Sequence, residues 1–249
     1  MSCAVDLRFG SFGIAYSLMK RSLSLFAAVT SLVVSVSCGQ NNQSSTDRTD
    51  RRDQVKAQLN TPMEAEAEEG MARAYFASGC FWCVEAVYES VKGVQESISG
   101  YAGGHTKNPT YESSNTGTTG HAEAVEIIYD PKVVSFETLV DVYFGSQNVT
   151  QVNGQGPDRG SQYRSIIFYQ NAEQKKIIDE KIAKLNEELA PQEVAAEVYP
   201  FEKFWLGEDY HQDYERKHPN HPYIRGVSIP RLNKFQAKFP ELLKKNSNH

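Results

Sequence analysis

The sequence predicts an α+β fold in which helices pack against a mixed sheet as a two-layer sandwich, with long irregular loops and a C-terminal tail. Three observations predict this class. Short apolar runs typical of strands recur between residues 74 and 198, amphipathic helix patterns separate them, and two long polar stretches interrupt the order. The 249 residues, 40% hydrophobic and 23% charged, have an ordinary globular composition and accommodate one domain with appendages.

Two appendages precede that domain. Residues 1–38 form an extension with an export signal, because Met19-Lys20-Arg21 precedes an apolar run that ends in small residues before Cys38. Cys38 resembles the lipidated cysteine of a bacterial lipoprotein, although Ser35 stands where leucine is usual. An uncleaved amphiphilic tail, or a gene start placed too early, is the alternative. Residues 39–71 are polar with little to bury, which predicts a disordered linker.

The appendages and the charge set the expected location and exclude one class of partner. An export signal with a lipid anchor at Cys38 predicts the cell envelope or periplasm, whereas the alternative is a cytoplasmic protein. The formal net charge is −5, from 26 basic and 31 acidic residues, without a basic cluster in the body of the chain. Nucleic acid is therefore not an expected partner.

The folded domain spans residues 72–245 and begins with a strand, turn and helix. Ala74–Ala77 predicts the strand, Ser78-Gly79 the turn, and the helix begins near Cys80. Residues 106–120 and 145–161 predict long surface loops, which are more often functional than idle. The remaining expected elements are strands over 95–101, 122–129, 164–169 and 194–198, and helices from Ser135 to 144 and over 172–189 and 209–217.

The stretch Gly79-Cys80-Phe81-Trp82-Cys83 places two thiols at the start of the first helix. Backbone N–H groups and the positive end of the helix dipole favour a thiolate there, which predicts a lowered pKa for Cys80. Dithiol redox chemistry is the better use of the pair. Buried core cysteines are the plainer alternative. A zinc site would have only His105 and His121 as further ligands, so we expect no metal.

Glu123 is the candidate acid that the strand pattern indicates. Alternation places it on the same face of strand 122–129 as Val125, Ile127 and Tyr129, which is the more apolar face. Burial beside hydrocarbon raises the pKa of a carboxyl group and leaves it protonated at neutral pH. The alternative is an exposed glutamate at the end of the strand.

Several motifs in one order resemble the peptide methionine sulfoxide reductase A family, from about residue 72 to residue 223. They are Gly79-Cys80-Phe81-Trp82, Gly100-Tyr101-Ala102-Gly103-Gly104, Asn108-Pro109-Thr110-Tyr111, Thr119-Gly120-His121-Ala122-Glu123, Gln155-Gly156-Pro157-Asp158, Gly160-Ser161-Gln162-Tyr163-Arg164-Ser165 and Glu208-Asp209-Tyr210-His211-Gln212. The resemblance implies that residues 72–245 are a catalytic domain. In it, Cys80 attacks the sulfur of methionine S-sulfoxide, free or in an oxidised protein, and becomes a sulfenic acid.

The resemblance also implies roles for other residues. Glu123 protonates the sulfoxide oxygen, assisted by the hydroxyl groups of Tyr101 and Tyr163, although each tyrosine taken alone is better explained as a packing residue. Asp158 is expected to hold its loop and a nearby water or amide. Phe81 and Trp82 form the apolar seat for the substrate methyl group. No metal or organic cofactor is implied, thioredoxin or another dithiol is the reductant, and a monomer is expected.

The chain departs from many relatives in how Cys80 is recycled. No cysteine follows Cys83, and Cys83 stands where relatives commonly have glycine. From one helical turn away it can attack the sulfenic acid and form a Cys80–Cys83 disulfide. The alternative is a small core residue at 83, with an external thiol as reductant. A second departure is Ser146-Gln147-Asn148-Val149, where relatives tend to read His-Asp-Pro.

Two other functions are compatible with the motif. The first is a general thiol–disulfide exchanger built on the two cysteines. The second is an envelope lipoprotein whose Phe81-Trp82 pocket only binds ligands.

Overall fold

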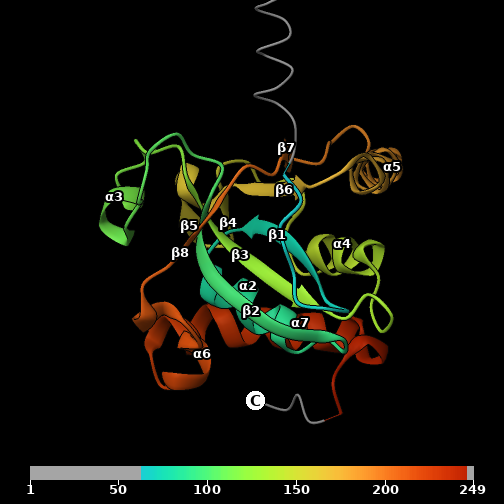
Figure 1. Cartoon of the computed structure of the whole chain (residues 1–249). Coiled ribbons are helices and arrows are strands. Elements are labelled where there is room, and N and C mark those ends of the chain that lie inside the picture. The colour runs from blue at the N-terminus through green and yellow to red at the C-terminus, as the bar shows by residue number, and fades with distance from the viewer. Residues whose placement is uncertain (1–62, 246–249) are drawn as a thin grey trace, which may run out of the picture. The chain divides into compact units, whose positions relative to one another are not determined.

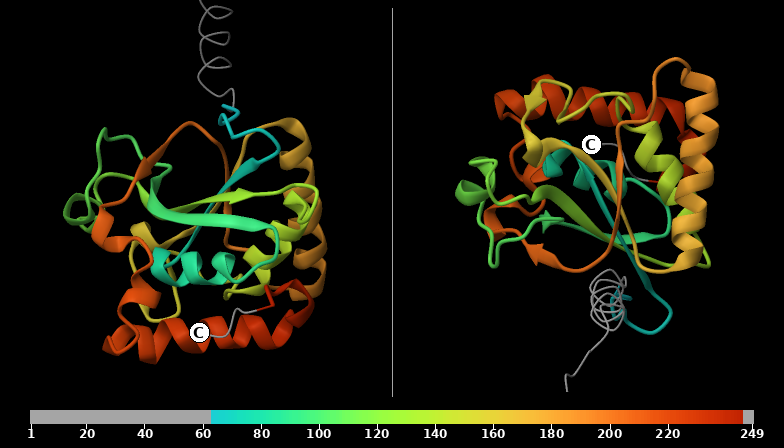
Figure 2. Two further views of the ribbon diagram at one scale, coloured as in Figure 1. Left: turned by 60° about the horizontal axis from the view of Figure 1, so that its bottom comes forward. Right: turned by 90° about the horizontal axis from the view of Figure 1, so that it is seen from above.

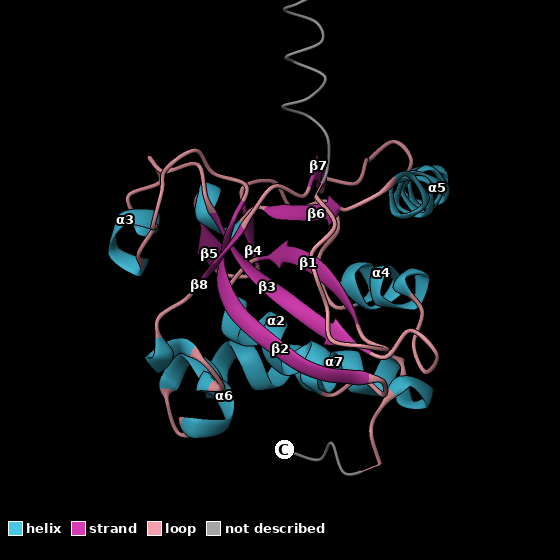
Figure 3. Cartoon of the chain, in the orientation of Figure 1, coloured by secondary structure: helices cyan, strands magenta, loops and turns pink. Residues whose placement is uncertain are grey.

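The computed structural model describes residues 63–245, in which a curved six-stranded sheet forms the centre (Figures 1 and 3). The strands lie in the order β7-β6-β1-β3-β2-β8, and all neighbours are antiparallel except β6 and β7, which are parallel. The sheet is therefore mixed, as predicted. Its strands are β1 Ala72–Ser78, β2 Val94–Ala102, β3 Ala122–Tyr129, β6 Ser165–Tyr169, β7 Glu197–Pro200 and β8 Phe204–Leu206.

The helices cover one face of this sheet. Strand alternation sends Ala74 and Phe76 of β1 to that face, where they join the larger hydrophobic core with residues from four helices. These helices are α2 Phe81–Glu89, α4 Phe136–Gly145, α5 Ala172–Leu189 and α7 Ile229–Lys238. Figure 2 shows α2 next to the sheet, α7 packed along α2, and α4 and α5 at the side of the sheet. The architecture is the predicted two-layer α+β sandwich.

The opposite face of the sheet carries a smaller apolar cluster. Tyr75 and Ala77 of β1 point to this side, and Phe201 stacks on Tyr75 with ring centroids 3.8 Å apart. Ala65, which precedes β1, and Phe204, the first residue of β8, pack against this cluster. No helix is needed here because the segment around residues 201–204 excludes water from the aromatic rings.

The local signals that define the helix starts agree with the sequence. The hydroxyl of Ser135 accepts a hydrogen bond from the N–H of Thr138 at 3.1 Å, and the side chain of Asn171 accepts one from Gln174 at 3.0 Å. These caps begin α4 and α5 at the predicted positions.

The C-terminal part and the loops differ from the prediction. The expected helix over 209–217 is two short pieces, η2 Asp209–His211 and α6 Tyr214–Lys217, because Asp213 between them has a left-handed backbone with φ +55°. The tail contains a π-helical turn, η3 Ile224–Ser228, and the helix α7, which were not predicted. The long loops contain α3 Tyr111–Asn115, the hairpin β4 Gly154–Gln155 with β5 Asp158–Arg159, and η1 Ser161–Tyr163; η4 Pro240–Leu242 follows α7.

The predicted export signal and lipid-anchor cysteine, and all but the last residues of the predicted linker, lie outside the described residues. Within residues 63–245, no helix combines the length and the apolar character that crossing a membrane requires.

Candidate active site

Cys80 lies at the junction between β1 and α2. Gly79 has φ +79°, and a side chain there would place its Cβ 2.5 Å from Gln155, so only glycine fits this turn. Cys80 is the N-terminal cap of α2, and its carbonyl accepts hydrogen bonds from the N–H groups of Cys83 and Val84 at 3.2 and 3.3 Å. The turn therefore fixes Cys80 directly above the first helical turn, which carries Cys83.

Glu123, on β3, contacts the start of α2. Its Oε2 accepts a hydrogen bond from the N–H of Phe81 at 3.1 Å, and its side chain is buried, as strand parity predicted. Phe81 directly follows Cys80, so the carboxyl group lies beside the nucleophile. Burial raises the pKa of Glu123 to about 8; the Phe81 hydrogen bond opposes this shift, and the negative charges of Asp158 and Cys83 add to it. Glu123 thus holds a proton at neutral pH.

The two thiols do not have the pKa values that the helix start alone predicts. Burial raises the pKa of Cys80 well above its usual value, and the hydrogen bond with Cys83 and the charges of Cys83 and Glu123 raise it further. The expectation of a lowered pKa for Cys80 is therefore wrong for the free enzyme, because desolvation and neighbouring charge outweigh the helix terminus. The hydrogen bond from Cys80, followed by the charge of Arg231, lowers the pKa of Cys83 to about 7 against the effect of burial.

Tyr101 and Tyr163 lie on the Glu123 side. Tyr101 is the cross-strand partner of Glu123 between β2 and β3, and its hydroxyl donates a hydrogen bond to Oε2 of Glu208 at 2.8 Å. The hydroxyl of Tyr163 donates to Oδ1 of Asn115 at 3.4 Å. Burial raises the pKa of both phenols, and the charge of Glu123 adds to both shifts. Both hydroxyls therefore stay protonated near Glu123, although neither donates to it in this structure.

Phe81 and Trp82 have different surroundings. Phe81 is 1% exposed and belongs to the core, with its ring 4.7 Å from that of His211. Trp82 is half-buried, stacks on Tyr214 with centroids 3.8 Å apart, and donates its Nε1–H to Nδ1 of His211 at 3.1 Å. Of the two predicted substrate contacts, Trp82 alone retains an accessible surface.

Asp158 is hydrogen-bonded on the side of Cys83, although its charge also acts on Glu123 and Tyr163. Its Oδ2 accepts a hydrogen bond from the hydroxyl of Tyr223 at 2.6 Å, and that hydroxyl lies 3.7 Å from Sγ of Cys83. Cys83, Asp158 and Tyr223 line one cavity of about 560 Å³ between the 145–158 segment and α7. Arg231 of α7 closes the same cavity. The structure thus divides the predicted residues into a Cys80 side and a Cys83 side.

Sequence reasoning missed four residues around the two thiols: Glu208, His211, Tyr223 and Arg231. Glu208 and His211 belong to a motif of the resemblance that assigns them no role. Tyr223 stands at the end of the resemblance, where 13 tyrosines in the chain gave no reason to choose it. Arg231 belongs to the unpredicted α7. The sequence pattern that indicates α7 is Pro230 in the first helical turn, with Leu232 and Phe235 at helical spacing on a buried face.

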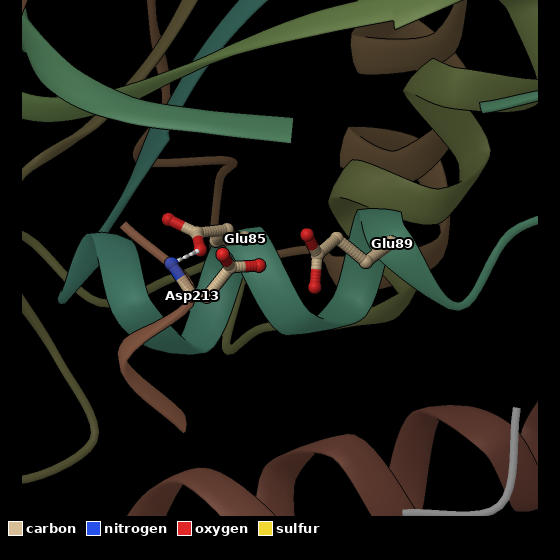
Figure 4. A group of neighbouring side chains, drawn as sticks. All are labelled: Glu85, Glu89 and Asp213. Atoms are coloured by element: carbon tan, nitrogen blue, oxygen red, sulfur yellow. Dashed lines mark hydrogen bonds between the residues drawn. The ribbon is translucent and has the colours of Figure 1, made fainter. Parts of the chain in front are cut away.

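A cluster of three acidic groups joins α2 to Asp213 in the 208–214 segment (Figure 4). Ligand atoms of Glu85, Glu89 and Asp213 are all within 4.8 Å of one another, the only such group of three among residues 63–245. Both oxygens of Glu85 are already hydrogen-bonded, one to the N–H of Asp213 and one to the hydroxyl of Ser99. These bonds tie α2 to β2 and to the 208–214 segment, so the cluster has a structural explanation.

Comparisons with known proteins agree on one family. The model of the family described as peptide methionine sulfoxide reductase matches residues 72–243. The peptide methionine sulfoxide reductase MsrA of Pasteurella multocida is 46% identical over 172 residues, which cover 69% of this chain and 98% of the relative. The MsrA of Sulfolobus acidocaldarius is 48% identical over 171 residues, or 69% and 97% of the two chains.

Solved structures give the same result. Methionine sulfoxide reductase A of Corynebacterium diphtheriae superposes with a TM-score of 0.56 at 32% identity, over 62% of this chain and 78% of the other. The reduced form of Mxr1 from Saccharomyces cerevisiae superposes with a TM-score of 0.54 at 29% identity, over 63% and 91% of the two chains.

Proposed function

The chain belongs to the peptide methionine sulfoxide reductase family and reduces methionine sulfoxide to methionine, and we propose that Cys80 and Glu123 perform this reaction together. The observation that carries the proposal is the hydrogen bond from the N–H of Phe81 to Glu123, which holds a buried acid against the residue next to Cys80. A nucleophilic sulfur and a proton donor on one helix start suit a substrate whose sulfur is electrophilic and whose oxygen must be protonated.

The proposed reaction balances without an added oxidant. The sulfur of Cys80 attacks the sulfoxide sulfur, and Glu123 donates its proton to the sulfoxide oxygen. The S–O bond of the substrate breaks, the hydroxyl group ends on the Cys80 sulfur, and methionine leaves. The proton that the Cys80 thiol gives up restores Glu123. The products are methionine and a sulfenic acid at Cys80. The phenols of Tyr101 and Tyr163 keep their protons and can donate hydrogen bonds to the sulfoxide oxygen. General acid catalysis of this kind accelerates a reaction by about 10²–10⁴.

The substrate side of the proposal concerns the sulfoxide and its methyl group. The half-buried Trp82, stacked on Tyr214, offers an apolar wall for the methyl group, while Phe81 supports it from within the core. We assign the S epimer as substrate, both in oxidised proteins and as the free amino acid.

Recycling uses the second thiol. Cys83 attacks the sulfenic acid, a Cys80–Cys83 disulfide forms, and water leaves. A thioredoxin-like dithiol then restores both thiols, without a metal or organic cofactor. The location of Cys83 in the first turn of the helix that Cys80 caps supports this role.

Incubation of the protein with racemic methionine sulfoxide and dithiothreitol tests the activity. One epimer should disappear completely while the other remains, and Cys80→Ser should consume neither. Turnover by Cys80→Ser would refute the role of Cys80. Equal loss of both epimers would refute the epimer assignment, and disulfide reduction without sulfoxide loss would indicate a thiol–disulfide exchanger.

Replacement of Cys83 tests recycling separately. Cys83→Ser should release one equivalent of methionine per enzyme in a rapid single-turnover experiment and then stop in the presence of thioredoxin. Cys83→Ala is the matched variant that also lacks the hydroxyl, and it should behave identically. Undiminished thioredoxin-driven turnover by either variant would contradict the resolving role.

We also propose that the protein is exported and held as a monomer at the cell envelope by a lipid on Cys38. The basic Met19-Lys20-Arg21 stretch, the apolar run after it and the small residues before Cys38 support this location. Mass spectrometry of the mature N-terminus is the test. A lipidated Cys38 as first residue is expected, and a chain that retains its N-terminal residues would contradict export.

A further inference from the structure

The surroundings of Cys83 contain charged and phenolic groups that the reduction of the sulfoxide does not use. The cavity of about 560 Å³ beside Cys83 is lined by Asp158, Tyr223 and Arg231, and neither Cys80 nor Glu123 lines it. These residues come from three separate segments: β5, the turn before η3, and α7. Asp158 and Arg231 therefore lie with the resolving sulfur, and the Tyr223 hydroxyl, which also interacts with Cys80, lies between the two thiols.

Tyr223 and Asp158 form a hydrogen-bonded route away from Cys83. The hydroxyl of Tyr223 donates to Oδ2 of Asp158 at 2.6 Å, so its oxygen is available to accept from the Cys83 thiol 3.7 Å away. That distance suits an S–H···O contact, because sulfur is larger than oxygen. Burial raises the pKa of Tyr223, so the phenol stays neutral and can accept one proton while it passes on another.

Arg231 supplies a positive charge with no carboxylate partner. Its guanidinium donates hydrogen bonds to the carbonyl of Ser146 at 2.8 Å and to the carbonyl and hydroxyl of Ser78 at 2.9 and 2.8 Å, all neutral oxygens. No ion pair of Arg231 occurs among the described residues 63–245. A half-buried guanidinium whose charge is not neutralised stabilises an anion that forms across the cavity.

We propose that Tyr223, Asp158 and Arg231 form a resolving half-site that removes the proton of Cys83 and stabilises its thiolate for attack on oxidised Cys80. Tyr223 is the catalytic residue of this half-site because its hydroxyl contacts the reacting sulfur. Arg231 acts through its charge, and Asp158 orients the phenol. The inference rests on the proposed function, since it concerns the second chemical step of that reaction.

The step balances as follows. The proton of Cys83 passes through Tyr223 to Asp158, and the thiolate attacks Sγ of the Cys80 sulfenic acid. The S–S bond forms and the S–O bond of Cys80 breaks. The departing hydroxide takes up the proton that Asp158 received and leaves as water, so that Asp158 is again a carboxylate. Oxidised Cys80 is reduced and Cys83 is oxidised, so no further oxidant or reductant takes part.

The pH dependence of disulfide formation is the sharpest readout. The titratable or charged groups that face Cys83 are Cys80 and Tyr223, the Asp158 carboxylate, Glu123 from β3, and Arg231 and Lys234 from α7. Of these, Arg231 contributes an opposite charge that lowers the pKa of Cys83. Loss of that charge should shift the pH midpoint of disulfide formation upward, whereas a merely structural role would lower the rate at every pH.

The experiment uses the full chain and one equivalent of methionine sulfoxide, with rapid quenching at a series of pH values. Methionine released reports the first step. The tryptic peptide Ala74–Lys92, which contains both cysteines and no other, reports the second step when it becomes lighter by two hydrogens. In Arg231→Met, we expect the midpoint to rise by about one pH unit, so that the rate falls about tenfold below the wild-type midpoint and recovers above it.

Three further variants separate charge from structure. Arg231→Lys keeps the charge and should keep the wild-type midpoint. Arg225→Met removes an equal charge from an exposed position in η3 and should also keep it. Tyr223→Phe keeps the ring and should slow disulfide formation about tenfold at pH values below the midpoint. This variant tests the proposal even if Arg231→Met does not fold.

The outcomes are distinct. An unchanged midpoint in Arg231→Met, equal shifts in Arg231→Met and Arg231→Lys, or a wild-type rate in Tyr223→Phe would overturn the half-site. The absence of a methionine burst in the wild-type protein would instead refute the proposed function.

Discussion

The two cysteines of α2 lie one helical turn apart, yet they meet opposite surroundings. Cys80 faces a protonated carboxylic acid and buried phenols, and its pKa is raised. Cys83 faces an arginine and a phenol bound to a carboxylate, and the hydrogen bond from Cys80, followed by the charge of Arg231, lowers its pKa to about 7. Both sulfurs share the same helix start and the same dipole. The difference therefore arises from burial, from the hydrogen bond between the two thiols and from the groups opposite each sulfur, rather than from position on the helix.

The two sides also differ in how the fold builds them. On the Cys80 side, the pairing of β2 with β3 places Tyr101 opposite Glu123, so strand register alone brings these groups together. On the Cys83 side, Tyr223 and Arg231 come from the C-terminal tail, which packs against α2 through α7. The first side is part of the sheet, and the second depends on a tail that docks on the helix.

The largest effect is expected from a substitution that removes the chemistry of the Cys80 side and leaves the Cys83 side intact. Glu123→Gln removes the proton donor and should slow the release of methionine in the first turnover by about 10²–10⁴. Glu126→Gln is the matched control on the same strand, where the carboxylate faces the other side of the sheet and binds Arg73 and Tyr75. It should leave the first turnover unchanged. Similar losses in both variants would mean that strand stability, rather than acid catalysis, explains the effect.

The pH dependence of the two steps sharpens the comparison. The first step requires protonated Glu123, whose pKa is about 8, so its rate should be constant at lower pH and fall about tenfold per unit above pH 8. The second step requires the Cys83 thiolate and should instead rise with pH. Single-turnover release of methionine and formation of the disulfide peptide measure the two separately. Profiles that move in the same direction would remove the distinction between the sides.

A smaller effect is expected from replacement of Glu208, the residue that positions the Tyr101 hydroxyl. Glu208 accepts hydrogen bonds from the Tyr101 hydroxyl at 2.8 Å and from the N–H of Tyr111 at 2.9 Å. Glu208→Gln weakens this charge-assisted bond, so the first turnover should slow about tenfold while disulfide formation is unchanged. Asp209→Asn, next in the chain, is the control and should have no effect on either step. A slower second step in Glu208→Gln would show that Glu208 supports both sides.

The sheet and the Cys80 side could be predicted because their signals are local. Alternation in residues 122–129 determined both the strand and the burial of Glu123, and the Gly79 turn with its apolar flanks located Cys80 at a helix start. The direction of the Cys80 pKa could not be predicted in this way. It depends on burial and on charges from β3, which local helix geometry does not contain.

The Cys83 side could not be predicted because it is assembled over long distances in the sequence. The contact between Cys83 and Tyr223 spans 140 residues, and the bonds from Arg231 to Ser78 span 153. The strand β8 was also missed, since three residues give too short an alternation to distinguish from a loop. The resemblance to a known family did not help here, because Cys83 stands at one of its departures from that family.

Glu85 offers a third comparison, between a buried acid with a chemical role and one without. Burial raises its pKa to about 8, as it does for Glu123, but its oxygens bind Ser99 and the backbone of Asp213 instead of facing a thiol. If surroundings decide function, a raised pKa at Glu85 should appear in the stability of the fold and have little effect on either chemical step.

The sign of that effect follows from proton linkage. Folded Glu85 keeps its proton up to about pH 8, whereas the unfolded group loses it near 4.5, so its contribution to stability is full below pH 4.5 and is lost as the pH rises through 8. Glu85→Gln cannot titrate, and its free energy of unfolding relative to wild type should rise by about 3–4 kcal/mol between pH 5 and 8 in urea titrations. The exposed Glu96→Gln should parallel the wild type. Parallel curves for Glu85→Gln as well would mean that water reaches this carboxyl, and that burial at α2 protects Glu123 alone.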